Sequence, residues 1–176
     1  MHSLWRTLSS KTVYDGRLIQ VKVDRVMEPG NARAVREVVQ HSGSVVVLPH
    51  CPDGRVLLVR QFRYAARRSL WELVAGSIEP GESAVEAAAR ELAEETGYRA
   101  ARLRELFAFY PSPGFLTERM VLVEARGLTR SKPHPEADER ILVRRFTRDR
   151  LRHMLDARRF QDAKTLVGML WFLLRL

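Results

Sequence analysis

Three glutamates lie close together near the middle of the chain, at Glu91, Glu94 and Glu95. In a helix, residues three and four positions apart share one side, so these carboxylates would project together. Their repulsion would cost an isolated helix about 0.2 to 0.5 kcal/mol for each pair. A bound Mg²⁺ ion, which prefers oxygen ligands and leaves positions for water and phosphate oxygens, would offset that cost. The alternative is an acidic helix face that contacts only solvent.

The neighbouring residues predict the helix that would hold these glutamates. Ser83 and Glu86 have the spacing of a capping box, and residues 84–93 are rich in helix formers. Gly97 is a typical C-terminal stop. The apolar spacing predicts that the core-facing residues of this helix are Val85, Ala89 and Leu92.

Strand patterns surround the predicted helix. Apolar and polar residues alternate over 19–23, and turn signals on either side predict a small antiparallel meander over 12–40. The unbroken apolar run 45–48 predicts a strand that is buried on both faces. Further strands are expected over 34–39, 56–62, 70–75, 103–110, 120–125 and 141–146. Helices are expected over 148–155 and 163–174, the second with Asp162 as its N-cap. This order of elements predicts an α/β fold, a mixed sandwich.

Composition restricts the classes of partner. The chain has 176 residues with a formal net charge of +9, and arginines make up 26 of its 30 basic residues. Arginine binds phosphate well, but these arginines form no dense block and have few aromatic residues between them. No nucleic acid is therefore expected as a partner.

Cellular location is also constrained by the sequence. The single cysteine, Cys51, leaves no internal disulfide, and the Cys and His spacing gives no zinc-site pattern. No apolar run approaches the roughly 20 residues of a membrane span, and the start of the chain has no leader pattern. We expect a soluble, cytoplasmic protein that has no membrane partner.

The three glutamates are part of a longer sequence pattern. Gly76 is followed after five residues by Glu82, and after seven more by the run Arg90-Glu91-Leu92-Ala93-Glu94-Glu95-Thr96-Gly97-Tyr98. This resembles the Nudix box, GX5EX7REUXEEXGU, if Tyr98 takes the last bulky apolar position. The resemblance implies an α/β/α sandwich with a mixed sheet that hydrolyses a nucleoside diphosphate linked to another group.

The same resemblance implies roles for the residues of the box. Glu91, Glu94 and Glu95 would hold Mg²⁺, with Mn²⁺ possible, together with the backbone carbonyl of Ala75. Arg90 and Glu82 would orient this group, and Glu94 could instead hold a water.

Segments outside the box resemble the ADP-ribose pyrophosphatase branch of the family. They are Arg36-Glu37-Val38-Val39, Leu58-Val59-Arg60-Gln61-Phe62-Arg63-Tyr64, Trp71-Glu72-Leu73-Val74-Ala75-Gly76, Ser112-Pro113-Gly114-Phe115 with Thr117-Glu118, and Asp162-Ala163-Lys164-Thr165. The resemblance implies hydrolysis of ADP-ribose to AMP and ribose 5-phosphate. The candidate substrate-binding residues are Arg36, Arg60, Arg63, Gly114 and Glu118.

One departure from the branch affects the general base. The branch has an acidic string before its last strand, where this chain has Glu136-Ala137-Asp138-Glu139. Glu139 is the first candidate for the base and Glu136 the second, and Glu118 is the choice if neither serves.

The meander over 12–40 is too thin to cover its own apolar stripe, so either the chain's own catalytic domain or a second copy must cover it. The resemblance to the ADP-ribose pyrophosphatase branch favours a second copy. It implies that residues 1–41 form an N-terminal part that mediates a homodimer and completes the partner's site, with the Nudix domain over 42–176. The sequence leaves two alternative functions open. One is a GDP-mannose or other nucleotide-sugar pyrophosphatase, and the other is a nucleotide-binding sensor without catalysis.

Overall fold

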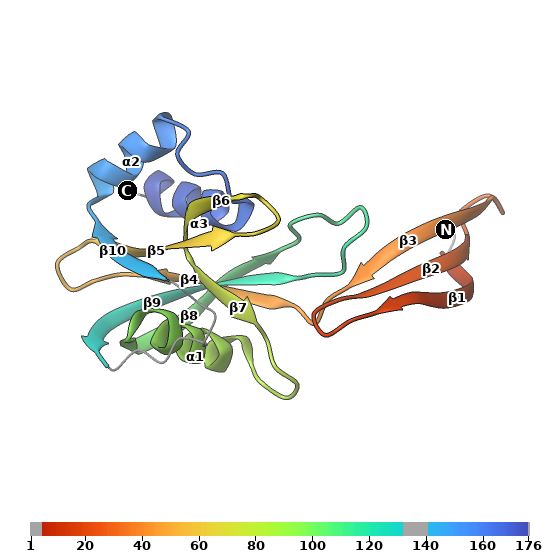
Figure 1. The fold of residues 1–176 in the computed structure, drawn as a ribbon, viewed down its shortest axis with the longest axis horizontal. Coiled ribbons are helices and arrows are strands. Elements are labelled where there is room, and N and C mark those ends of the chain that lie inside the picture. The colour runs from red at the N-terminus through yellow and green to blue at the C-terminus, as the bar shows by residue number, and fades with distance from the viewer. Residues whose placement is uncertain (1–4, 132–140, 176) are drawn as a thin grey trace. The chain divides into compact units, whose positions relative to one another are not determined.

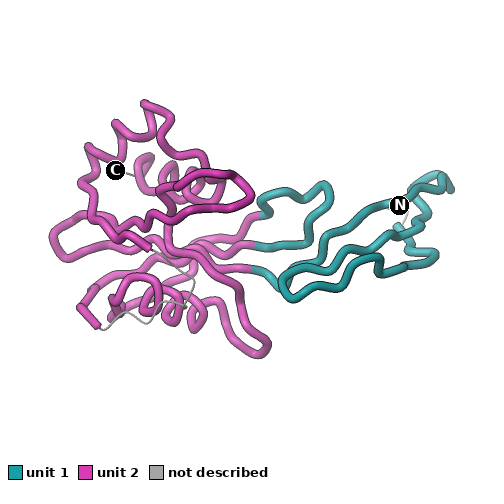
Figure 2. The backbone as a smooth tube through the Cα atoms, viewed as in Figure 1, with its two compact units in different colours: residues 1–43, 110–119 teal, residues 44–109, 120–176 magenta. Residues whose placement is uncertain are grey.

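A computed structural model describes residues 5–131 and 141–175. The chain divides into two compact units (Figure 2). Unit 1 comprises residues 1–43 and 110–119, and unit 2 comprises residues 44–109 and 120–176.

Unit 1 is built on a three-stranded antiparallel sheet. Its strands are β1 (Arg6–Asp15), β2 (Gln20–Met27) and β3 (Arg33–Gln40), in the order β1-β2-β3. The sheet begins six residues earlier than the predicted meander. Residues 110–119 join it through Val39, whose N–H donates to Phe115 and whose carbonyl accepts from Thr117, at 2.7 and 2.9 Å.

The larger sheet of unit 2 has the order β7-β4-β9-β8. Its strands are β4 (Ser44–Pro49), β7 (Val74–Ser77), β8 (Tyr98–Phe109) and β9 (Met120–Arg130). Strands β4 and β9 are parallel, and the other pairs are antiparallel. Every residue of β4 is buried, as its unbroken apolar run predicts.

A second sheet in unit 2 has the order β10-β5-β6. Its strands are β5 (Val56–Arg63), β6 (Arg68–Glu72) and β10 (Leu142–Phe146). The single strand predicted over 70–75 is wrong, because Glu72 ends β6 in this sheet and Val74 starts β7 in the other. Between them, the Leu73 N–H donates to Thr165 Oγ1 at 2.9 Å instead of to a strand.

Helices cover both sides of these sheets (Figure 1). Helix α1 (Ala84–Thr96) packs on a core that includes Val45, Leu57 and Val123. Helices α2 (Arg148–Asp156) and α3 (Ala163–Leu174) contribute to a second core on the other side, with Leu48 and Leu122. Unit 2 is therefore an α/β/α sandwich with mixed strand directions. Among the described residues, no helix has the length and apolar character needed to cross a membrane.

The predicted core face of α1 needs correction. Val85 is only partly buried and Ala89 is exposed, whereas Leu92 is buried as expected. The buried positions also include Ala87, Ala88, Glu95 and Thr96. The helix is therefore rotated so that small alanines and one side of the glutamate cluster face the sheet.

Candidate active site

Helix α1 begins and ends where its local sequence predicts. The Ser83 hydroxyl accepts from the Glu86 N–H at 3.3 Å, and the Glu86 carboxylate accepts from the Ser83 N–H at 2.9 Å. The hydrogen bond from the Ser83 hydroxyl lowers the pKa of Glu86. Gly97 adopts a left-handed conformation with φ 68° and donates to the Ala93 carbonyl, which ends the helix.

Glycine at position 76 allows a close approach between β7 and α1. A Cβ atom built at Gly76 would overlap the carboxylate of Glu91. The register of β7 against β4, with Ala75 opposite Val46 and Gly76 opposite Val45, fixes this strand in place. Only glycine therefore lets the Glu91 carboxylate lie against the backbone that follows Ala75.

Arg90 connects the loop after β7 to the helix. Its guanidinium donates to both oxygens of Glu82, at 3.0 and 2.9 Å, and to the Ser77 carbonyl at 2.9 Å. It also donates to Glu91 at 2.6 Å and to Glu94 at 3.2 Å. The hydrogen bond with Arg90 lowers the pKa of Glu82, and the same contact raises the pKa of Arg90. Arg90 thus holds three carboxylates in fixed positions.

The glutamates of α1 differ in how far they are buried. The Glu91 side chain is 14% exposed and that of Glu94 38% exposed, while Glu95 is buried. Within the described ranges, no group of three or more His, Cys, Asp or Glu side chains is placed to hold a metal ion. The assignment of Ala75, Glu91, Glu94 and Glu95 as metal ligands therefore stays a prediction.

The donor set nevertheless suits a hard cation. All the candidate ligands are oxygens, and the glycine at position 76 leaves the space in which the Glu91 carboxylate lies beside the strand. A divalent cation bound there would neutralise charge on a pyrophosphate and lower the pKa of a bound water.

Arg63 belongs to an ion network, centred on the buried carboxylate of Glu72, that the sequence did not predict. It donates to both oxygens of Glu72 at 2.9 and 2.8 Å, and Lys164 contacts Glu72 at 2.5 Å. Lys164 also pairs with Asp162 at 2.9 Å. Burial alone would raise the pKa of Glu72, but the hydrogen bond from Arg63 and the Lys164 charge outweigh it and lower that pKa. The only signal in the sequence was an acidic residue within an apolar strand.

Arg60 lies apart from Arg63. The two residues are three positions apart in β5, so their side chains leave opposite faces of the sheet. Arg63 shares its face with Leu57 and Val59, which belong to the core beneath α1. The guanidinium of Arg60 lies instead 6.0 Å from the ring of Trp71. The structure therefore does not bring these two candidates together.

The other substrate candidates belong to unit 1. Arg36 pairs with Glu28, and its guanidinium lies 5.9 Å from the Trp5 ring. Glu118 lies 3.8 Å from His41 Nδ1, while Gly114 is in the exposed part of the 110–119 segment. The base candidates Glu136 and Glu139 lie outside the described residues.

Known families match both parts of the chain. Residues 40–166 match the NUDIX domain, and residues 5–39 match the nucleoside diphosphate sugar hydrolase N-terminal domain. The first match covers well over half of the chain. The chain belongs to the Nudix family.

Several known proteins resemble this Nudix hydrolase over most of its length. ADP-ribose pyrophosphatase of Bacillus subtilis (strain 168) is 35% identical over 162 residues, 91% of this chain and 88% of that protein. Methanol dehydrogenase activator of Bacillus methanolicus is 31% identical over 166 residues, 93% and 90% of the two chains. A crystal structure of an ADP compounds hydrolase has a TM-score of 0.84 at 26% identity, covering 97% of this chain and 92% of that one. These findings confirm the predicted family and the Nudix fold with an N-terminal antiparallel sheet.

Proposed function

We propose that this Nudix hydrolase cleaves the pyrophosphate of ADP-ribose to AMP and ribose 5-phosphate in the cytoplasm, with Mg²⁺ or Mn²⁺ as cofactor. The observation that carries the proposal is the arrangement around Arg90, which holds Glu82, Glu91 and Glu94 together beside Gly76. The substrate is inferred from the relatives named ADP-ribose pyrophosphatase and ADP compounds hydrolase.

The chain's own residues would divide the work as follows. Glu91, Glu94, Glu95 and the Ala75 carbonyl would hold the cation, while Arg90 and Glu82 would keep the glutamates oriented. Glu139, or failing that Glu136, would take the proton from the attacking water. Pyrophosphate hydrolysis needs both neutralisation of the phosphate charge and a base for the attacking water, and different residues would supply the two.

Arg63 is the candidate substrate-binding residue of unit 2. Arg63 keeps one guanidinium nitrogen outside its two bonds to Glu72, so Nη1 is available for a phosphate oxygen. Arg36, Gly114 and Glu118 are the candidates from unit 1. Because Arg60 leaves β5 on the other face of the sheet, we leave it out of this site.

A homodimer is the second part of the proposal. Unit 1 exposes large apolar side chains, including Leu8, Val13 and Val35 in its sheet and Leu18 in the turn between β1 and β2. A second copy would cover such a surface and would bring unit 1 to the partner's site. Sedimentation would show a dimer, and Val35→Glu would shift it toward monomer with loss of activity. Full activity in a monomer would contradict the shared site.

A second candidate function is hydrolysis of a nucleotide sugar such as GDP-mannose. It is favoured by the match of residues 5–39 to the N-terminal domain of nucleoside diphosphate sugar hydrolases. A third candidate, a sensor without catalysis, is less favoured because Glu82, Glu91, Glu94 and Glu95 are all present.

Hydrolysis rates would separate these candidates. The purified protein is assayed with ADP-ribose, GDP-mannose, ADP-glucose and diadenosine polyphosphates, each with Mg²⁺, with Mn²⁺ and with a chelator. We expect the largest kcat/KM for ADP-ribose and no activity with the chelator. Glu95→Gln should lower kcat by orders of magnitude, whereas the exposed control Glu105→Gln should not. A preference for GDP-mannose would select the second candidate, and no hydrolysis of any substrate would select the sensor.

A further inference from the structure

A cavity of about 480 Å³ lies on the side of unit 2 that α2 covers, opposite the side that carries α1. Its floor is the sheet β10-β5-β6, and its rim includes α2 and the residues that follow it. The volume is within the range of small-molecule sites, roughly 300 to 1,000 Å³. Arg60, which we left out of the active site, lines this cavity, and none of the residues kept in that site does.

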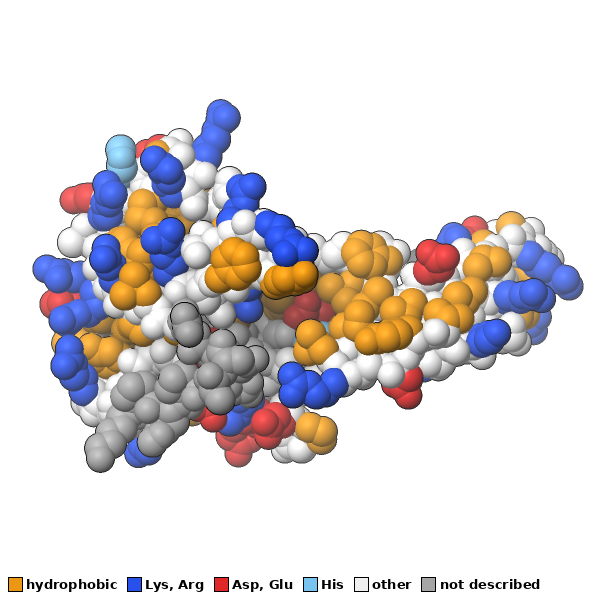
Figure 3. Space-filling view, viewed as in Figure 1, with side chains coloured by type: hydrophobic (Ala, Val, Ile, Leu, Met, Phe, Trp, Pro, Cys, Tyr) orange, Lys and Arg blue, Asp and Glu red, His pale blue; other side chains and the backbone are white. Residues whose placement is uncertain are grey.

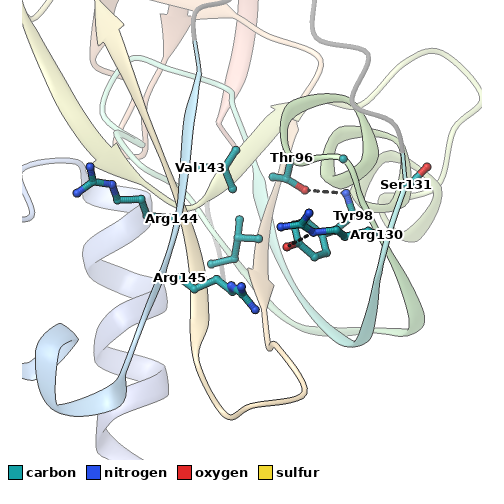
Figure 4. Close-up of a pocket in the computed structure, with 9 residues that line it drawn as sticks. Thr96, Tyr98, Arg130, Ser131, Val143, Arg144 and Arg145 are labelled. Carbon is teal, nitrogen blue, oxygen red and sulfur yellow. Dashed lines mark hydrogen bonds between the residues drawn. The ribbon is translucent and has the colours of Figure 1, made fainter.

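Strand register brings two arginines and a tryptophan to this floor. Arg144 in β10 pairs with Leu58, and Trp71 in β6 pairs with Arg60. Because Leu58 and Arg60 are two positions apart in β5, all four side chains share one face. Both guanidinium groups lie 6.0 Å from the centre of the Trp71 ring. In Figure 4, Arg144 accordingly extends from β10 away from Thr96, which ends α1, and from Tyr98, which starts β8.

Three more arginines stand on the opposite rim. Arg150 comes from α2, and Arg158 and Arg159 follow the helix in a tight turn. The turn is closed by hydrogen bonds from the Arg158 N–H to Leu155 and from the Arg159 N–H to Met154, at 3.0 and 2.9 Å. Figure 3 shows basic side chains around a hydrophobic area in the region of α2.

Charge sets this cavity apart from the other arginine clusters of unit 2. No aspartate or glutamate is among its lining residues, and none of its five arginines forms an ion pair with a carboxylate of the described residues. By contrast, Arg63 and Arg90 each hold a glutamate. In the neighbouring pocket of Figure 4, Arg145 pairs with Asp53 and Arg130 donates to the Tyr98 hydroxyl.

We propose that this cavity is a second ligand site, which binds the phosphate chain of a nucleoside di- or triphosphate between the arginines of the sheet and those of the α2 rim. Guanidinium forks suit phosphate oxygens, and several of them around one cavity match several negative charges. Trp71 supplies an aromatic surface for the base beside the phosphates. A ligand bound here is separated from the glutamates of α1 by the sheets, so it is not a substrate in place to react.

Calorimetric titration of the full-length protein tests the site. ATP and inorganic tripolyphosphate are titrated separately at physiological ionic strength, with a chelator present so that no divalent metal occupies the α1 glutamates. The test variant is Arg144→Gln/Arg150→Gln, which removes one arginine from each side of the cavity. The matched control is Arg99→Gln/Arg152→Gln, which removes two exposed arginines of unit 2 outside the cavity. Thermal unfolding checks that both variants are folded.

We expect the test variant to bind both probes at least about tenfold more weakly than the wild-type chain, with the control variant unchanged. ATP should bind more tightly than tripolyphosphate, because only ATP contacts Trp71. Equal weakening in both variants would overturn the site in favour of general charge attraction. Tripolyphosphate binding as tight as ATP would overturn the nucleotide assignment. Tighter binding of a single-stranded oligonucleotide, lost in the same test variant, would reassign the surface to nucleic acid.

Discussion

The carboxylate of Glu91 lies where a side chain at residue 76 would have to be, so the strand and the helix meet at this point through a glycine. The contact explains in physical terms why the sequence pattern joins a glycine to a glutamate 15 positions later.

Replacing Gly76 by alanine should move Glu91 away from the backbone of β7. The added methyl group overlaps a carboxylate at the end of a flexible side chain, so the fold should survive while the glutamate shifts. We expect a large fall in kcat with a smaller change in the melting temperature. Gly54→Ala is a control for kcat alone. A Cβ there meets nothing nearby, but its left-handed φ of 78° strains an alanine, so its melting temperature should fall without a fall in kcat. Unchanged kcat in Gly76→Ala would contradict the role of this contact.

Arg90→Lys should show whether the site needs only the positive charge of Arg90 or also the hydrogen bonds of its guanidinium. Lysine keeps the positive charge but cannot bridge both oxygens of Glu82 while reaching Ser77 and Glu91. We expect kcat to fall by about tenfold or more and the affinity for Mg²⁺, read from the activity curve, to fall with it. Arg99→Lys, at an exposed position, serves as the control. Wild-type kinetics in Arg90→Lys would mean that charge alone suffices.

Glu72→Gln should destabilise the fold in a way that depends on pH. The substitution leaves Arg63 and Lys164 without their shared carboxylate, and breaking the buried Glu72–Lys164 pair should cost about 3 kcal/mol. The pKa of Glu72 is lowered in the folded state, so its contribution is complete above about pH 4.5, the ordinary value, and disappears as the pH falls through the lowered pKa. The difference in free energy of unfolding between wild type and variant should therefore shrink on acidification.

Urea unfolding at a series of pH values measures this difference. Glu105→Gln, at an exposed position, should show no such dependence. A difference that stays constant from neutral to strongly acidic pH would contradict the assigned pKa direction.

The general base can be located by comparing two variants of the acidic segment. If Glu139 takes the proton, Glu139→Gln should depress kcat with little change in KM, and Glu136→Gln should be milder. Full kinetic curves with ADP-ribose give the comparison. The reverse ranking would transfer the role to Glu136, and two mild variants would transfer it to Glu118.

Local signals in the sequence predicted α1 well. Ser83, Glu86 and Gly97 set both ends of the helix through contacts within four residues, so sequence spacing was enough. The predicted buried face of the helix was wrong at Ala89, because that face depends on how the helix packs against β7. That contact depends on Gly76 and Glu91, which a count of apolar positions ignores.

Long-range contacts account for what the sequence could not predict. The break at Leu73 depends on Thr165, and the burial of Glu72 depends on Lys164, each 92 positions away. The separation of Arg60 from Arg63 did follow from strand alternation, once β5 was known to continue through both residues. The family resemblance placed Arg60 and Arg63 together because they belong to one sequence motif. A motif does not show that the two side chains leave opposite faces of the sheet.

The hydrogen bond from Leu73 to Thr165 affects how the chain can fold while it is being synthesised. Leu73 leads directly into β7, the strand of Ala75 and Gly76, and it packs closely against Gly168 of α3. During synthesis, the box from Gly76 to Tyr98 leaves the ribosome well before α3 does. The position of Leu73, just before the box, can therefore be fixed only after α3 has been synthesised. A chain stalled before residue 163 would contain the glutamates of the box but lack the helix that holds Leu73 in place.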